Sequence, residues 1–413
     1  MVDLRQILSQ GRKRLGLLLG AGAPMSLLVD ERNNIDSEGS PLIPDVARLT
    51  DIAIETLCGD DRAVIEALFP DRDGDVNIET ILTRIRRLSE AIENERIYGL
   101  NGSEYTGLAE RICTTIGGIV SPVLPDSPNP YTELTTWIGG TYRDHPVEIF
   151  TPNYDLLLEE SFERNRLPYF DGFSGSHRPF FDPASISSDS LPARWSRLWK
   201  IHGSLGWEIQ DGNIIRTGSR NATSLIYPDH LKYDRIEKQP YTAMFERLKS
   251  FLNTPDSLLL CTGFSFFDAH ITAILDEALA ANTHTAVIAF QFRTLQQEEA
   301  AKELAIKRRN LSVYARDGGV IFGIEGKWRL GESPTEEWLS IRNTFWDAGS
   351  AHGGSFLLGD FAKLARFVAL TRAESLVPAA RDDEDEALRA GAPGADEGDV
   401  RPLMASEAAD AES

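Results

Sequence analysis

The chain has 413 residues, 42% of them hydrophobic and 25% charged, a composition typical of a globular protein with two or three domains. Its formal net charge of −21 argues against strong direct binding to nucleic acid, because such binding depends on Lys and Arg side chains that neutralise phosphates. No apolar run is long enough to span a membrane, and the N-terminus lacks a signal-peptide pattern. We therefore expect a cytoplasmic protein with no membrane partner.

The cysteines and histidines argue against a metal centre. Cys58, Cys113 and Cys261 are far apart in the sequence and form no Cys-x-x-Cys pair. The seven histidines show no spacing typical of a metal site. The sequence therefore predicts neither a disulfide framework nor a bound metal ion.

The N-terminal segment predicts a strand that ends in a glycine turn. Residues 2–14 have the pattern of a short amphipathic helix, and the apolar run at 15–19 predicts a buried strand. A Gly-Ala-Gly turn follows at 20–22, and we expect a helix from about Met25. Such a unit can bring backbone N–H groups to a phosphate. An ordinary turn has the same pattern, and Met25 stands where the dinucleotide fingerprint has its third glycine.

A helical insertion is predicted over residues 45–145, after a polar loop at 30–44. Its apolar residues recur at spacings of three and four, which places them on one face of each helix. We expect it to serve as a structural cover or an oligomer surface. Its predicted helices are 45–58, 78–92, 104–119 and 131–142.

Strands and helices alternate in the rest of the main domain. This alternation is typical of an α/β fold with a doubly wound, parallel, Rossmann-like sheet. We assign residues 1–44 and 146–320 to this domain. Its predicted strands after the insertion are 147–150, 257–261, 285–290 and 311–314, each followed by a helix or a turn.

Three further regions differ in composition. Residues 165–235 are rich in aromatic residues, proline and serine and predict a small irregular module over the main sheet, with a hairpin around Asp211-Gly212. Residues 321–376 form a C-terminal extension with a predicted helix at 359–372. Residues 377–413 are acidic, contain few large apolar residues, and are predicted to be disordered.

Polar or glycine-rich residues follow four predicted strand ends, those of 15–19, 147–150, 257–261 and the segment 198–201. Taken singly, each has an ordinary explanation: Asn153 and Asp155 can cap a helix, a buried histidine such as His202 is commonly a core residue, and Ser265 can cap the next helix. Ligands in open α/β sheets bind beyond the carboxyl ends of the strands, so the four ends together indicate a site. They are Gly20-Ala21-Gly22, Thr151-x-Asn153-x-Asp155, His202-Gly203 and Gly263-x-Ser265.

In this order the four motifs resemble those of the sirtuin superfamily, in outline over residues 13–315. The resemblance implies that NAD binds at the C-terminal ends of the strands and that its nicotinamide–ribose bond is cleaved. The chain departs from the sirtuins that remove acetyl groups from lysine. It lacks their two Cys-x-x-Cys zinc pairs, and Pro24 replaces the serine of their glycine loop.

The helical insertion and the segments 202–207 and 263–268 look similar instead to bacterial sirtuin-like proteins of antiphage defence, in which the fold acts as an NAD hydrolase. The segment 356–361 resembles members that are paired with a HerA-type hexameric ATPase. The resemblance therefore implies an NAD hydrolase without a zinc ribbon. It also implies a HerA-type ATPase as a candidate partner. Because unregulated NAD loss would harm the host cell, we expect control by homo-oligomer formation.

The chemistry of the reaction fits the residues that carry the resemblance. Cleavage passes through an oxocarbenium-like state, and the leaving nicotinamide already carries positive charge, so no strong general acid is needed. By resemblance, Asn153 orients the water or the nicotinamide amide, and His202 acts as general base. We expect the N–H groups of Gly20, Ala21, Gly22 and Ala23 to bind the pyrophosphate. Asp155 and Ser265 are expected to hold the ribose and the adjoining phosphate. The other expected NAD-binding residues are Thr151, Gly263 and Asp268.

Two other functions remain open at this point. The chain can be a regulatory subunit that senses NAD or ADP-ribose without turnover and scaffolds an ATPase. It can also be an NAD-dependent protein deacylase, which the missing zinc pairs disfavour. The presence of both Asn153 and His202 favours the hydrolase, because a protein that only binds has no need of both.

Overall fold

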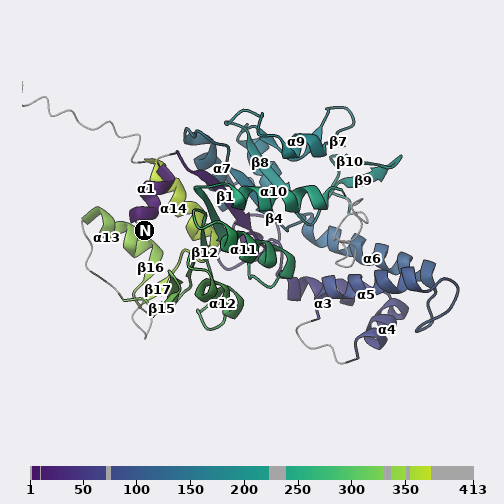
Figure 1. Cartoon of the computed structure of the whole chain (residues 1–413). Helices are drawn as coiled ribbons and strands as arrows, with labels where there is room; N and C mark the ends of the chain where they lie inside the picture. The colour runs from purple at the N-terminus through teal and green to yellow at the C-terminus, as the bar shows by residue number, and fades with distance from the viewer. Residues whose placement is uncertain are drawn as a thin grey trace, which may run out of the picture. The chain divides into compact units, whose positions relative to one another are not determined.

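The computed structural model of the chain describes residues 2–9, 11–70, 76–222, 239–329, 331, 336–349 and 354–373. These residues form an α/β fold around a nine-stranded sheet (Figure 1). The predicted disordered tail at 377–413 lies outside the described residues. None of the helices in the described part of the chain is long and apolar enough to cross a membrane.

The main sheet has the order β15-β14-β13-β12-β11-β1-β4-β8-β5. Neighbouring strands from β13 to β5 pair in parallel, which confirms the predicted Rossmann-like sheet, whereas β14 and β15 add an antiparallel edge that was not predicted. The strands are β1 Arg14–Leu19, β4 Glu148–Thr151, β5 Tyr169–Phe170, β8 Ser196–Lys200, β11 Ser257–Thr262, β12 Ala286–Phe290, β13 Leu311–Tyr314, β14 Gly318–Ile321 and β15 Ile324–Lys327.

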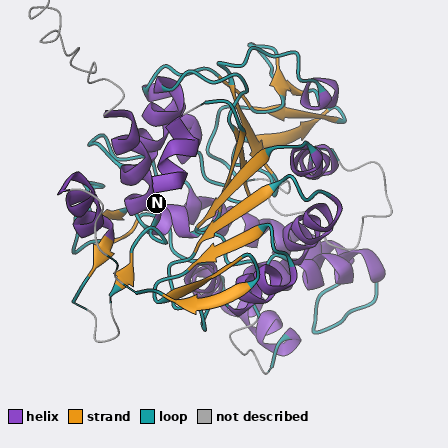
Figure 2. Ribbon diagram, turned by 60° about the vertical axis from the view of Figure 1, so that its left-hand side comes forward, coloured by secondary structure: helices purple, strands orange, loops and turns teal. Residues whose placement is uncertain are grey.

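Helices cover both faces of the sheet, as Figure 2 shows. Because successive side chains of a strand point to opposite faces, Leu17 and Leu19 of β1 pack in one core and Leu18 packs in the other. The first core includes residues of α1 (Val2–Ser9), α7 (Pro130–Gly140), α8 (Leu157–Arg164) and α14 (Phe361–Ala373). The second includes residues of α10 (Tyr241–Asn253), α11 (Ala269–Ala281) and α12 (Glu299–Lys307).

The strand order places a crevice at the ends of β1 and β11. Strands β4, β8 and β5 lie on one side of β1 in the sheet. The later strand β11 lies on the other side of β1, so the direction in which strands are added reverses there. Ligands of open α/β sheets bind where the order reverses in this way. The glycine turn after β1 and the segment after β11 therefore lie together at the expected position of a site.

The segment after β1 differs from its prediction. The helix α2 (Gly22–Met25) is only four residues long, and it begins inside the glycine turn rather than at Met25. Two short strands, β2 (Leu28–Val29) and β3 (Ser40–Pro41), then pair around the loop predicted at 30–44. Leu28 and Val29 thus pair with Ser40 and Pro41 as antiparallel strands and do not continue a helix.

The described part of the helical insertion contains one more helix than predicted. Figure 1 shows α3, α5 and α6 side by side, with α4 next to them. Asn77 caps α5, and an Asn101–Glu104 capping box begins α6. The insertion contains α3 Val46–Thr56, the unpredicted α4 Gly59–Leu68, α5 Ile78–Ala91, α6 Gly102–Val120, and the α7 given above.

The described strands of the region 165–235 belong to two different sheets. Its strands β5 and β8 belong to the main sheet, and only the others form a small second sheet in the order β6-β7-β10-β9. The predicted hairpin is present, with Asp211 and Gly212 both at positive φ, as a tight turn requires. The remaining elements are β6 Phe173–Ser174, β7 Phe180–Phe181, α9 Pro183–Ser187, β9 Trp207–Gln210 and β10 Asn213–Arg216.

The C-terminal extension returns to the main sheet. The backbone N–H of Phe356 donates to the carbonyl of Arg316, and a Cβ on Gly359 would lie 2.0 Å from the carbonyl oxygen of Gln291. The start of α14 is thereby held against the end of β12. The described elements before it are α13 Glu336–Phe345, β16 Trp346–Asp347 and β17 Ser355–Phe356.

Candidate functional site

The two glycine loops of the crevice touch through their backbones. A Cβ on Gly20 would lie 2.3 Å from the carbonyl oxygen of Gly263, and a Cβ on Gly22 would lie 2.6 Å from the Cα of Gly263. Gly263 itself has a φ of +63°, in the left-handed region that favours glycine. These glycines are therefore needed for the contact between the loops.

Most of the backbone donors in the first loop already have acceptors. The N–H of Gly20 donates to the carbonyl of Thr262 at 3.0 Å, that of Gly22 to Gly263 at 2.9 Å, and that of Ala23 to Gly20 at 3.0 Å. These three N–H groups are therefore engaged within the protein, and the structure gives no support to the prediction that they bind a pyrophosphate. The N–H of Ala21 has no acceptor among the described residues and is the donor left for a ligand.

Asn153 is held at the end of β1, although the two segments are far apart in the sequence. Its side-chain Nδ2 donates to the carbonyl oxygen of Gly20 at 3.1 Å. The hydroxyl of Thr151 accepts from the backbone N–H of Asn153 at 3.1 Å and donates to the carbonyl oxygen of Leu19 at 2.7 Å. Thr151 is buried and positions Asn153 instead of facing a cavity.

His202 forms a buried pair with Asp268. Its Nε2 lies 3.0 Å from Oδ2 of Asp268, and both side chains are largely buried. The other carboxylate oxygen of Asp268 accepts from the N–H groups of His270 and Ile271 and so caps α11. Asp268 was predicted to bind NAD, but the structure places it as the partner that orients His202.

The two members of this pair shift each other's pKa. Burial alone would lower the pKa of His202, but the hydrogen bond to Asp268 and its negative charge outweigh burial and raise it above 6.5. Burial would raise the pKa of Asp268, but the hydrogen bond from His202 and its charge lower it to about 2. The pair thus favours a charged imidazole, the form that a general base has after it takes a proton.

Asp155 does not join this site. It is buried, its Oδ1 accepts from the N–H of Leu157, and it is absent from the walls of the cavities described below. Burial raises its pKa, and the charge of Lys200 opposes the rise. The geometry fits helix capping, the alternative that the sequence left open, and gives no support to a contact with the ribose.

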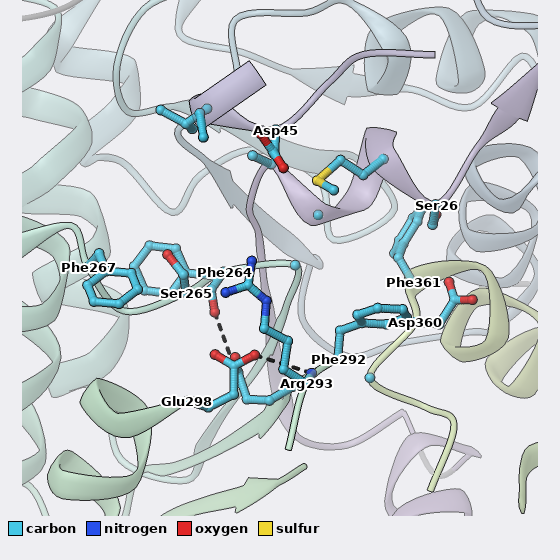
Figure 3. Close-up of a pocket in the computed structure, with 18 of the residues that line it drawn as sticks. Ser26, Asp45, Phe264, Ser265, Phe267, Phe292, Arg293, Glu298, Asp360 and Phe361 are labelled. Atoms are coloured by element: carbon cyan, nitrogen blue, oxygen red, sulfur yellow. Dashed lines mark hydrogen bonds between the residues drawn. The ribbon is translucent and has the colours of Figure 1, made fainter. Parts of the chain in front are cut away.

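A cavity of about 700 Å³ lies over the crevice (Figure 3). The predicted residues Ala21, Gly22, Gly263 and Ser265 line it. Ser265 is exposed and is not the helix cap, because α11 begins at Ala269 with Asp268 as its cap. A cavity of this size is typical of small-molecule sites.

Sequence reasoning missed the other walls of this cavity. They come from the end of β12, from the first helices of the insertion and from the start of α14. In Figure 3 the side chain of Arg293 extends toward Ser265, and its backbone N–H donates to Glu298 at 3.3 Å. The polar and aromatic residues that were missed include Asp45, Asp51, Asn77, Phe267, Phe292, Arg293, Glu298, Asp360 and Phe361.

Part of this wall had a signal in the sequence. Arg293 lies just beyond the end of β12, so the rule used for the four predicted strand ends also applies to it. Asp45 and Asn77 are recognisable as helix caps, and they do cap α3 and α5. Nothing local in the sequence indicates that these caps lie over the sheet.

Asn153 and His202 do not line the 700 Å³ cavity. A second cavity of about 650 Å³ includes Asp268 in its wall and shares Asn77 and Phe267 with the first. The His202–Asp268 pair therefore lies beside the two cavities. Within the described ranges no group of three or more His, Cys, Asp or Glu side chains is placed to hold a metal ion.

Comparison with known families agrees with this arrangement. Residues 147–314 match the family model of the SIR2-like domain. SIR2-like domains are generally NAD-dependent enzymes, so the match supports the sirtuin-like superfamily and an NAD-related function. The matched SIR2-like region contains Asn153, His202, Ser265 and Asp268, whereas the glycine turn after β1 lies before it. No curated protein matches the chain.

Proposed function

We propose that the chain hydrolyses NAD at the nicotinamide–ribose bond. The observation that supports this most directly is the placement of Asn153 and the His202–Asp268 pair at the ends of β4, β8 and β11, next to a nucleotide-sized cavity at the glycine loops. Water attacks the anomeric carbon of the ribose, and the bond to nicotinamide breaks with its electron pair. The products are ADP-ribose, nicotinamide and one proton.

The residues divide into binding and reacting groups in this proposal. The 700 Å³ cavity holds the adenosine diphosphate part, with Arg293 and the N–H of Ala21 as donors to the phosphates and Ser265 as a polar contact. Asn153 orients the water or the nicotinamide amide. His202 takes the proton from the water, and Asp268 stabilises the imidazolium that forms.

The test is mass-spectrometric analysis of NAD incubated with the purified full chain. We expect ADP-ribose and nicotinamide in equal amounts, and a loss of about 100-fold or more in His202→Ala and Asn153→Ala. His284→Ala removes an exposed histidine outside the site and serves as the matched control. Full activity in either site variant would remove that residue from the mechanism, and a cyclic product would replace hydrolysis by cyclisation.

We further propose that this activity is regulated and serves antiphage defence by depleting NAD in the cytoplasm. Unregulated loss of NAD would harm the host cell, so we infer control by homo-oligomer formation and by a HerA-type ATPase partner. Measuring NAD loss for the chain alone and with that ATPase, with light scattering for size, tests both points. Equal activity of the monomer alone would contradict the proposed control.

One observation favours a second candidate function. Because the walls of the 700 Å³ cavity include neither Asn153 nor His202, a nucleotide can occupy it without touching either residue. The chain would then sense NAD or ADP-ribose as a scaffold subunit of the ATPase complex. If calorimetry shows that NAD binds and the NAD is recovered intact afterwards, this second function would be favoured. Turnover in a peptide assay would favour the less supported NAD-dependent protein deacylase.

A further inference from the structure

The second cavity lies between the helical insertion and the start of α11. Helix α5 supplies one wall, and the segment from Phe267 to His270 supplies the other. Its volume of about 650 Å³ is large enough for a small-molecule ligand. The family match begins at residue 147, so the α5 wall belongs to a part of the chain that this match does not include.

Two arginines of α5 line this cavity. Arg84 and Arg87 are exposed, and neither forms a salt bridge or hydrogen bond with the residues that the structure describes. The guanidinium of Arg84 lies 5.0 Å from the centre of the Phe69 ring, which also lines the cavity. This cation–π contact holds one of the two charges in place.

The cavity also contains a hydroxyl group whose hydrogen bonds the protein does not supply. Thr83 is 7% exposed and lines the cavity, and its Oγ1 has no hydrogen-bond partner among the described residues. Buried polar groups without partners are rare, and ligands often satisfy them. Thr83 lies on the same helix as the two arginines, directly before Arg84.

The acidic groups in the wall do not neutralise the arginines. Asp268 is committed to His202 and to the cap of α11. Glu79 and His270 are the other ionisable groups of the wall, and among the described residues neither forms a salt bridge with Arg84 or Arg87. Two unpaired guanidinium groups with nearby threonine hydroxyls are the donor set that phosphate and carboxylate groups prefer.

We propose that this second cavity is a binding site for a small phosphate-bearing ligand, held by Arg84 and Arg87. The site adjoins the 700 Å³ cavity, with which it shares Asn77 and Phe267, but its arginines are different: Arg293 is the arginine in the wall of the 700 Å³ cavity. Its assignment depends on the residues of α5 and not on the cleavage of NAD. It would hold even if the proposed hydrolase activity were wrong.

The experiment is calorimetric titration of the full chain with inorganic pyrophosphate. We expect binding by the parent protein and a loss of affinity of about tenfold or more in the double variant R84M/R87M. Arg48→Met removes an exposed arginine of α3 that lines neither cavity, and it should keep this binding. Arg293→Met removes the phosphate-binding arginine proposed for the other cavity, and it should keep the binding step that R84M/R87M loses.

Three outcomes would overturn the proposal. One is a parent protein that does not bind pyrophosphate, and another is pyrophosphate binding that R84M/R87M leaves unchanged. Loss of binding in Arg293→Met alone would place the pyrophosphate in the first cavity and would have the same consequence. Since Arg84 and Arg87 are exposed, the variants should fold, and unchanged thermal melting verifies this.

Discussion

Asp155 and Asp268 both lie between a strand of the main sheet and the next helix, and the fold shifts their pKa values in opposite directions. Asp155 accepts the backbone N–H of Leu157 at the start of α8, and Asp268 accepts those of His270 and Ile271 at the start of α11. Burial raises the pKa of Asp155, whereas the pKa of Asp268 is lowered to about 2 by the hydrogen bond and charge of His202, against the effect of burial. Asp268 also lines a cavity, and Asp155 lines neither of the two.

This comparison shows what a strand-end motif does and does not specify. Both aspartates fit the motif pattern equally well, and both were predicted to bind NAD. The difference arises from the second carboxylate oxygen. In Asp268 that oxygen lies 3.0 Å from Nε2 of His202, which is in the turn after β8 and 66 positions away in the sequence.

The largest expected effect that separates the two aspartates is on NAD cleavage. Asparagine keeps the helix cap in both positions, but it removes the negative charge that stabilises the His202 imidazolium. We expect Asp268→Asn to reduce NAD cleavage by about 10- to 100-fold and Asp155→Asn to change it by less than about threefold. The measurement is the initial rate of nicotinamide release by each purified variant. Equal losses in both variants would mean that Asp155 contacts the substrate after all.

A second prediction compares the change in stability when a glycine is replaced by alanine in the crevice and at an exposed position of helix α6. Gly22→Ala places a Cβ 2.6 Å from the Cα of Gly263, so the backbones of the two loops must separate. We expect it to lower the free energy of unfolding by about 1–3 kcal/mol, as overpacking does. Gly118→Ala, in α6, meets nothing within 4 Å and should raise it by about 0.5–1 kcal/mol. Urea unfolding measures both, and similar values would show that the loops do not touch as described.

The smallest expected effect is the pH dependence of stability. Because the pKa of His202 is raised in the folded state, this residue stabilises the fold fully below pH 6.5. The stabilisation is lost as the pH rises through the pKa that His202 has in the folded protein. Because the pKa of Asp268 is lowered in the folded state, this residue stabilises the fold above pH 3.8. The stabilisation is lost as the pH falls toward about 2. The difference in the free energy of unfolding between the parent and His202→Gln should therefore be largest between about pH 4 and 6.5. With His284→Gln as the control, a difference that does not vary with pH would show that the pair is not ionised.

Part of the site followed from sequence because the relevant signal is local. Apolar runs that end in glycine or polar residues marked the ends of β1, β4, β8 and β11, and parallel strands bring their carboxyl ends to one edge. Ser265 and Gly263 were found in this way, and both line the main cavity. Arg293 has the same kind of signal at the end of β12 and was missed only because the rule was not applied there.

Other parts of the site had no local signal. Arg84 and Arg87 have the appearance of an ordinary exposed helix face, and Asp360 has that of an ordinary helix start. Their places in cavity walls come from the packing of the insertion and of the C-terminal extension over the sheet. The N–H groups of Gly20 and Gly22 in the first glycine loop donate to the carbonyls of Thr262 and Gly263. These acceptors lie about 240 residues further along the chain, so the sequence near Gly20 does not reveal them.

The sequence by itself determined the class of the fold and the strand ends at which a ligand site forms, because hydrophobic periodicity and glycine turns depend on near neighbours in the chain. Tertiary structure alone decided the role of each residue there. It paired His202 with Asp268, buried Asp155, and used the N–H groups of Gly20 and Gly22 within the protein. The physical reason is that burial, ion pairing and hydrogen-bond satisfaction depend on groups that only folding brings together.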